Sequence, residues 1–123
     1  MTIQEAISEV DALVENDYRS SIKVRWLSDL DRYVRHEITD THDGAPKEAF
    51  TGYDDGTAMS TVLLVPEPYS DVYRFYLEMH IYLANGEMGK YNNAKILYDN
   101  KYLTYVDYYN RCHMPIQKAY LKF

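Results

Sequence analysis

The architecture of this chain follows from residues 68–86, PYSDVYRFYLEMHIYLANG. Pro68 suits the first turn of a helix, where the N–H that proline lacks would have no helical partner. Asn85-Gly86 is typical of a helix end, because glycine adopts the left-handed conformation without strain. Two apolar stripes recur between these signals, one at Val72, Phe75, Tyr76, Met79 and Leu83 and one at Tyr73, Leu77, Ile81 and Ala84. A helix that is apolar on two sides is predicted to lie at the centre of a bundle.

A second long helix is predicted directly after this one, from about Gly89 to Met114, with Pro115 ending it. Gly86 and Gly89 favour a break and a sharp turn, although they could also mark a kink in one continuous helix. Apolar and aromatic side chains then recur at alternating steps of three and four, which is typical of a seam against a partner helix. These residues are Tyr91, Ala94, Tyr98, Tyr102, Tyr105, Tyr109 and Cys112.

Two further helices are predicted in the first third of the chain. Thr2 and Glu5 have the spacing of a capping box, and the first helix is expected from Thr2 to Val14. Ser20 or Ser21 can cap a second helix that reaches about His42. Its buried stripe is expected at Ile22, Trp26, Leu30, Val34 and Ile38, and its solvated face at Lys23, Arg25, Asp29, Asp31, Arg32 and Arg35.

The helical period vanishes between Asp43 and Pro68, where glycine and proline recur, so a long connection is expected with at most a short strand at Thr61–Val65. A connection of this length is uncommon unless it binds something or reaches a neighbour. Its apolar residues are therefore interface candidates: Phe50, Tyr53, Leu63, Leu64 and Val65. The alternative, that they fold back over the core of the same chain, stays open.

The chain is expected to form a single helical domain over residues 1–115, followed by a C-terminal tail at 116–123. The tail carries Tyr120, Leu121 and Phe123, more apolar surface than a solvated terminus needs, so these residues are further interface candidates. Eleven of the fourteen tyrosines follow Val65, a composition that suits either an assembly surface or a tyrosine-filled core.

Composition excludes several classes of protein. The 123 residues carry a net charge of −6 with acidic and basic residues interleaved, so no basic footprint for nucleic-acid binding is present. An acidic surface still suits a ring through which DNA passes without sticking. No leading segment resembles a signal peptide or membrane span, and Cys112 has no cysteine to pair with, so we expect a protein made in a reducing cytoplasm with a buried, structural Cys112.

Catalytic constellations are weak. His36, Asp40, His42 and Asp43 are metal-ligand residue types within two turns, but no third convergent ligand is evident beside His36 and Asp40. His80 is expected to be a partly buried histidine among apolar neighbours. Phosphate loops, nucleophile elbows and paired cysteine ligands are not found in the sequence. We therefore predict a protein that is not an enzyme and has no cofactor or metal.

Several segments taken together resemble small proteins of tailed bacteriophages. They are Ile22-Lys23-Val24-Arg25-Trp26-Leu27, Leu63-Leu64-Val65-Pro66-Glu67-Pro68-Tyr69, Tyr82-Leu83-Ala84-Asn85-Gly86-Glu87, Lys90-Tyr91-Asn92-Asn93, Tyr108-Tyr109-Asn110-Arg111 and His113-Met114-Pro115. The resemblance covers nearly the whole chain up to Pro115, and it is to head-to-tail connector proteins, also called head completion or adaptor proteins.

The resemblance implies a small helical bundle with an extended loop, working as a structural protein in the neck of the virion. It implies a homo-oligomeric ring of about twelve copies between the portal protein and a tail or stopper protein, with DNA passing through and no membrane involved. The alternative from another class is a monomeric regulatory or inhibitory module of phage origin that presents an acidic, tyrosine-rich face to a basic protein.

Overall fold

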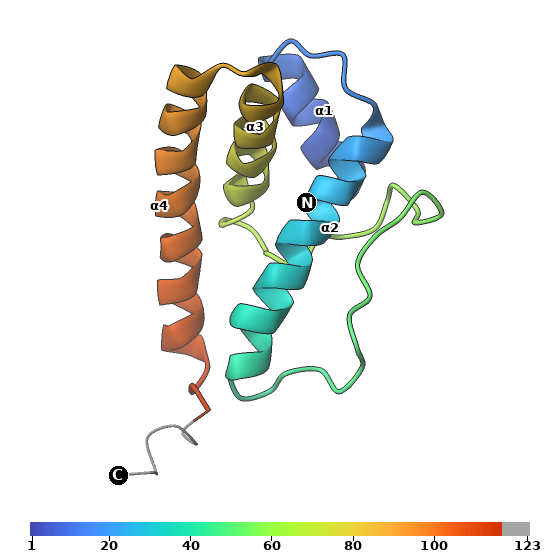
Figure 1. Cartoon of the computed structure of the whole chain (residues 1–123). Coiled ribbons are helices and arrows are strands. Elements are labelled where there is room, and N and C mark those ends of the chain that lie inside the picture. Colours follow the sequence, from blue (N-terminus) through green and yellow to red (C-terminus); the bar gives the residue numbers. More distant parts are fainter. Residues whose placement is uncertain (117–123) are drawn as a thin grey trace.

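The computed structural model describes residues 1–116 of the chain. Four α-helices and one short 3₁₀-helix follow one another: α1 (Ile3–Leu13), α2 (Ser20–Glu37), η1 (Thr39–Thr41), α3 (Asp71–Asn85) and α4 (Met88–Cys112) (Figure 1). The described residues contain no β-strand, only isolated bridges between Thr2 and Val62 and between His42 and Pro115. The predicted all-α bundle with a long connection between the second and third helices is confirmed.

Helix α3 is the centre of the bundle, as its two apolar stripes predict, and it packs against α1, α2 and α4. Gly86 ends it in the left-handed conformation with φ of 75°. The backbone N–H groups of Gly86 and Glu87 return to carbonyl oxygens in the last turn of α3, and α4 begins at Met88, so the predicted break is confirmed. The helix start was predicted too early, because residues 66–69 form a turn and α3 begins at Asp71.

The N-terminal helix is fixed at its first turn by the predicted capping box. The Thr2 hydroxyl accepts from the Glu5 N–H, and the Glu5 carboxylate accepts from the Thr2 N–H, both at 3.1 Å. The segment before the helix also pairs with the far end of the long connection. Ile3 N–H donates to the Thr61 carbonyl and Leu63 N–H to the Met1 carbonyl, so one bridge replaces the strand expected at 61–65.

Helix α2 differs from its prediction in both its length and its buried face. It ends at Glu37 instead of reaching His42, because Ile38 leaves the helical path and its carbonyl accepts from the Thr41 hydroxyl at 2.9 Å. The buried set is Lys23, Val24, Leu27, Ser28, Leu30, Asp31 and Val34, while Ile22 and Trp26 are only partly buried. The prediction that Lys23 and Asp31 are solvated was therefore wrong, because both charged groups find partners inside the fold.

Lys23 is 2% exposed, and its ammonium donates to the Asp11 carboxylate at 2.6 Å and to the Tyr18 carbonyl at 3.0 Å. These bonds tie α2 to the end of α1 and to the turn between them. A buried charge is tolerated only when its hydrogen-bonding groups are satisfied in this way. None of the helices in residues 1–116 is long and apolar enough to cross a membrane.

The middle of the long connection, residues 42–70, runs along the side of α2 that faces away from α4, and its last part returns behind α2 to α3 (Figure 1). Arg32 donates to the Thr51 carbonyl at 2.9 Å, and Arg35 donates to the Pro46 and Glu48 carbonyls. Gly52 has φ of 83°, and a Cβ at this position would lie 2.3 Å from the Ser28 hydroxyl. The connection is thus an irregular but closely attached layer of the domain.

Candidate interaction surfaces

The connection residues predicted from sequence as interface candidates lie mostly inside the chain. Tyr53, Leu63 and Val65 are 9%, 3% and 1% exposed and belong to the hydrophobic core, whereas Phe50 and Leu64 are partly buried against it. These residues therefore fold back over the core of the same chain, which is the alternative that the sequence left open. The structure therefore offers little of these side chains to a partner.

The carboxylate of Asp31, which sequence analysis assigned to the surface, is buried and holds the long connection against α2. Asp31 is 0% exposed, and its two oxygens accept from the Tyr73 hydroxyl at 2.6 Å, the Leu64 N–H at 3.1 Å and the Tyr53 hydroxyl. The Tyr73 hydroxyl in turn accepts from the Val65 N–H at 2.7 Å. One side chain of α2 thereby joins α3 to two points of the long connection, one in its middle at Tyr53 and one near its C-terminal end at Leu64.

Burial raises the pKa of Asp31, and the hydrogen bonds from Tyr53, Tyr73 and Leu64 oppose that rise without cancelling it. The pKa values of Tyr53 and Tyr73 are also raised, first by burial and then by the nearby Asp31 charge. Both hydroxyls therefore remain protonated donors. A fully paired polar cluster of this kind fixes one arrangement of the core, so its role here is to position the connection.

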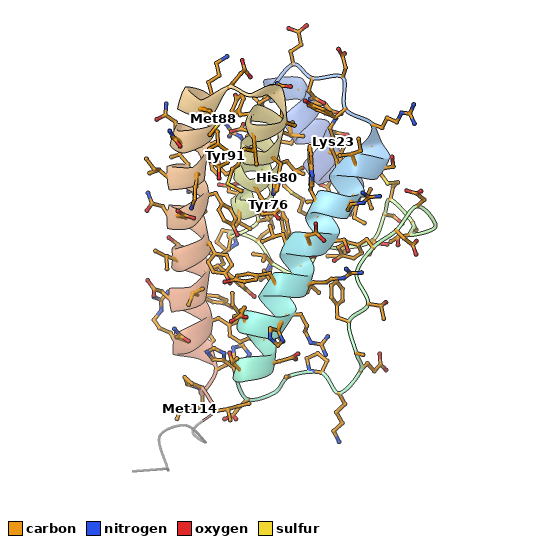
Figure 2. The ribbon with its side chains drawn as sticks, viewed as in Figure 1. Lys23, Tyr76, His80, Met88, Tyr91 and Met114 are labelled. Atoms are coloured by element: carbon orange, nitrogen blue, oxygen red, sulfur yellow. The ribbon has the colours of Figure 1, made fainter. Side chains whose placement is uncertain are left out.

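On the opposite side of α2 the domain is open. No Cα of α2 lies within 8 Å of a Cα of α4, so the two helices form the walls of a groove above α3. Figure 2 shows Tyr76 and His80 of α3 in the space between those two helices. The resulting cavity has a volume of about 380 Å³ and is lined by Asp29, Leu30, Tyr33, Tyr76, Tyr98, Asp99 and Tyr102. We call it the tyrosine groove.

Tyrosine rings in the tyrosine groove contact one another in series. The Tyr33 and Tyr102 rings meet across the opening with their centroids 5.7 Å apart. The ring centroid of Tyr98 lies 5.9 Å from that of Tyr102 and 5.2 Å from that of Tyr76. The Tyr76 and His80 ring centroids are 4.5 Å apart. The wall is therefore a continuous aromatic surface with several ring faces partly open to solvent.

Asp29 and Asp99 give the tyrosine groove a negative charge, because the tyrosines around them and His80 are neutral at neutral pH. Burial and the nearby Asp29 charge raise the pKa of Tyr76 to about 12. Burial also raises the pKa of Tyr98 and Tyr102, so the phenols stay neutral at neutral pH. The pKa of His80 is lowered by burial, an effect that Asp29 only partly offsets, and this histidine is neutral as well.

Helix α4 presents a second exposed surface on the side away from the bundle. Its 25 residues include only three buried ones, Ala94, Tyr105 and Tyr109. Four large apolar side chains on it are exposed: Met88, Ile96, Leu97 and Leu103 are 51%, 60%, 45% and 57% exposed. Helix geometry places Ile96 and Leu103 on the same side, with Met88 and Leu97 on its two flanks. We call these four residues the α4 outer face. The seam predicted for this helix is confirmed at Ala94, Tyr105 and Tyr109, which are buried. It is not confirmed at Cys112, which is the last residue of the helix and is exposed.

The metal-ligand residue types singled out in the sequence do not converge. His36 is exposed, and Asp40 accepts from Arg35 at 2.8 Å. His42 is 7% exposed and points toward α4, with its two ring nitrogens 2.6 Å from the Ile38 carbonyl and 2.5 Å from the Asn110 side-chain oxygen. Within residues 1–116, no three histidine, cysteine or acidic side chains are placed to hold a metal ion.

The predicted tail begins with a backbone contact to the domain, since the Ile116 N–H donates to the Thr41 carbonyl at 2.8 Å. The remaining interface candidates, Tyr120, Leu121 and Phe123, lie outside the described residues.

Comparison with known proteins yields no assignment. No protein-family model matches this sequence, no curated protein matches it, and no solved structure matches it. The resemblance to phage connector proteins therefore stays a prediction, and function has to be argued from the surfaces of the domain.

Proposed function

We propose that this chain is a structural subunit of a head-to-tail connector, which assembles into a ring between the portal and the tail of a bacteriophage. The observation that carries the proposal is the α4 outer face. A helix of 25 residues that buries only three of them leaves Ile96 and Leu103 more than half exposed, one heptad apart on the same side. In this proposal the α4 outer face is the contact with a neighbouring subunit, because exposed apolar surface is commonly used to bind another protein.

Other features of the chain suit the same role. A ring needs two different surfaces on each subunit, because every copy contacts its neighbours head to tail. Helix α4 and the middle of the long connection lie on opposite sides of α2 (Figure 1). The net charge of −6 suits a subunit near passing DNA, since repulsion prevents adhesion.

Native mass spectrometry and negative-stain imaging test this proposal, with the purified protein alone and mixed with the portal protein of the same phage. We expect rings or portal complexes with about twelve copies. The double variant Ile96→Ser, Leu103→Ser should remain folded and lose assembly, and the control Lys101→Ser on the same helix should assemble normally. A protein that stays monomeric and ignores the portal would contradict the proposal.

The tyrosine groove favours a second candidate function, a monomeric binding module that presents an acidic and aromatic surface to a basic protein. It would bind one to one and form no ring. The same native mass spectra separate the two candidates, because a module gives a single mass at all concentrations.

A further inference from the structure

We infer that the tyrosine groove is a binding site for a cationic side chain, and that its occupant is an arginine from an exposed segment of a partner protein. This inference does not depend on the choice between a ring subunit and a monomeric module, because one copy of the chain contains the whole groove. It rests on the arrangement of the aromatic rings, the position of the carboxylates and the shape of the opening.

The aromatic rings provide the first part of the argument. Tyr33, Tyr98 and Tyr102 come from two helices and surround one opening, with centroids separated by 5.7 and 5.9 Å. Aromatic faces attract cations through the negative charge of the π-system, and several rings around one cavity are the usual way in which proteins bind organic cations. Tyr33 is 52% exposed, so a ring face remains available to an incoming group.

Carboxylates on both walls provide the second part. Asp29 and Asp99 line the cavity from α2 and α4, and the charge of Glu37, two turns beyond Asp29, is close enough to raise the pKa of Tyr102. Asp99 is already paired with Lys95 at 3.0 Å. Asp29 makes no salt bridge with any lysine or arginine among residues 1–116. Asp29 is therefore the acceptor that a cationic ligand would use.

The basic residues nearest to Asp29 along α2 do not enter the groove. Arg25 and Arg32 line a different cavity, on the side of the long connection, where Asp29 and the acidic pair Asp54 and Asp55 also lie. No arginine or lysine side chain lines the tyrosine groove itself. Lys95 reaches Asp99 from outside this lining, so the groove combines aromatic faces with one carboxylate, Asp29, that has no salt bridge in the part of the chain that the structure describes.

The chemistry of the groove favours a guanidinium over other cations. A planar guanidinium can lie flat on a tyrosine ring and still donate two parallel hydrogen bonds to one carboxylate, whereas an ammonium is more strongly hydrated and acts as a point charge. The cavity of about 380 Å³ is partly open to solvent beside the contact between Tyr33 and Tyr102, which suits a side chain that enters from another protein. It lies at the small end of the range for ligand pockets.

The test is a titration with a short capped peptide that contains one arginine, followed by NMR of the tyrosine rings in the full chain. The matched probe carries citrulline, which has the same shape without the charge, and a third peptide carries lysine. We expect saturable shifts at Tyr33, Tyr98 and Tyr102 with the arginine peptide, weaker shifts with lysine and none with citrulline.

Substitutions then locate the site. Asp29→Asn should weaken binding of the arginine peptide by about tenfold or more, as expected for loss of a charge-assisted hydrogen bond. Tyr102→Leu should weaken it about two- to fivefold through loss of one aromatic face. Asp107→Asn, which removes an exposed charge from α4 away from the cavity, should leave affinity unchanged.

Four results would overturn the inference. The first three are equal binding of the citrulline peptide, saturable shifts only at residues outside the tyrosine groove, and no saturable shift at a peptide concentration about ten times the millimolar Kd typical of a weak site. Shifts of the same rings that depend on protein concentration, without any peptide, would also overturn it, because they would assign the groove to a second copy of the chain. The peptide series remains decisive if one of the variants is unstable, since it requires no substitution.

Discussion

The two sides of α2 are built in opposite ways. On one side an irregular connection of nearly thirty residues is attached through Asp31, Ser28, Arg32 and Arg35. On the other side the regular helix α4 leaves an open groove, crossed by the contact between Tyr33 and Tyr102. The irregular segment is the more firmly attached of the two, because buried polar groups that must find partners specify their position more strictly than aromatic rings that tolerate solvent.

The largest expected effect comes from removing the centre of the attached side. Asp31→Ala leaves the hydroxyls of Tyr53 and Tyr73 and the N–H of Leu64 without their acceptor in the core. The free energy of unfolding should fall by about 3 to 5 kcal/mol, measured by urea denaturation. Tyr33→Ala, on the open side of the same helix, is the comparison and should cost far less. Equal losses from the two variants would contradict the contrast.

A smaller effect is expected where the connection comes closest to α2. Gly52→Ala meets the Ser28 hydroxyl and Arg32, and it also forces alanine into a left-handed conformation. These two costs together should lower the free energy of unfolding by about 2 to 4 kcal/mol.

Gly44→Ala is the matched control for Gly52→Ala. Gly44 has φ of 80° but nothing within 4 Å of the added Cβ, so only the backbone strain remains. A loss of about 1 to 2 kcal/mol is expected in thermal or urea unfolding. Identical losses at the two glycines would show that the connection can move away from α2.

The pH dependence of stability sharpens the description of Asp31. Its pKa is raised in the folded protein by burial, so the folded state binds the proton more tightly than the unfolded state. The corresponding stabilisation is fully present below the unfolded-state pKa and is lost as the pH rises through the raised folded-state pKa. The difference in unfolding free energy between the wild type and Asp31→Ala should therefore be larger in acid than at neutral pH. A difference that shrinks in acid would mean that the three hydrogen bonds outweigh burial.

The smallest effect on folding is expected on the open side, at the α4 outer face. Leu103→Ser removes a side chain that is 57% exposed, and the free energy of unfolding should change by no more than about 0.5 kcal/mol. Size-exclusion chromatography and urea denaturation of the same sample separate assembly from stability. A loss of several kcal/mol would show that Leu103 is packed within the monomer.

The sequence predicts the periodic parts of this fold well and the irregular parts poorly. The two apolar stripes of residues 72–84 place α3 at the centre, and Gly86 marks its end, because these signals are local. The buried stripe of α2 was predicted in part: Leu30, Val34 and Ile38 are buried as expected. Lys23 and Asp31 were wrongly expected to be solvated, since they are buried by partners that lie up to 42 residues away in the chain. Charged side chains are normally assigned to the surface. Their burial here depends on hydrogen-bond partners from other segments of the chain, which a local sequence pattern does not reveal.

The candidate site was only partly visible in the sequence. The tyrosines of α4 were noticed as a seam, and the alternatives of core and assembly surface were both kept. The four-residue spacing of Asp29, Tyr33 and Glu37 was present in the sequence as well, but it looks like an ordinary solvated face. Asp29 and Tyr33 form one groove with the α4 tyrosines only because of the distance between α2 and α4, which no local pattern encodes.

The pairing of residues 1–3 with residues 61–63 has a consequence for the order in which the chain folds. Helix α1 is synthesised before α2, α3 and α4, yet its N-terminal segment pairs with backbone that is made some sixty residues later, and its buried face packs on α3. The α3–α4 hairpin, in contrast, joins neighbours along the chain and can form without distant contacts. We expect α1 to be among the last of these helices to dock, which leaves its apolar face available to chaperones during synthesis.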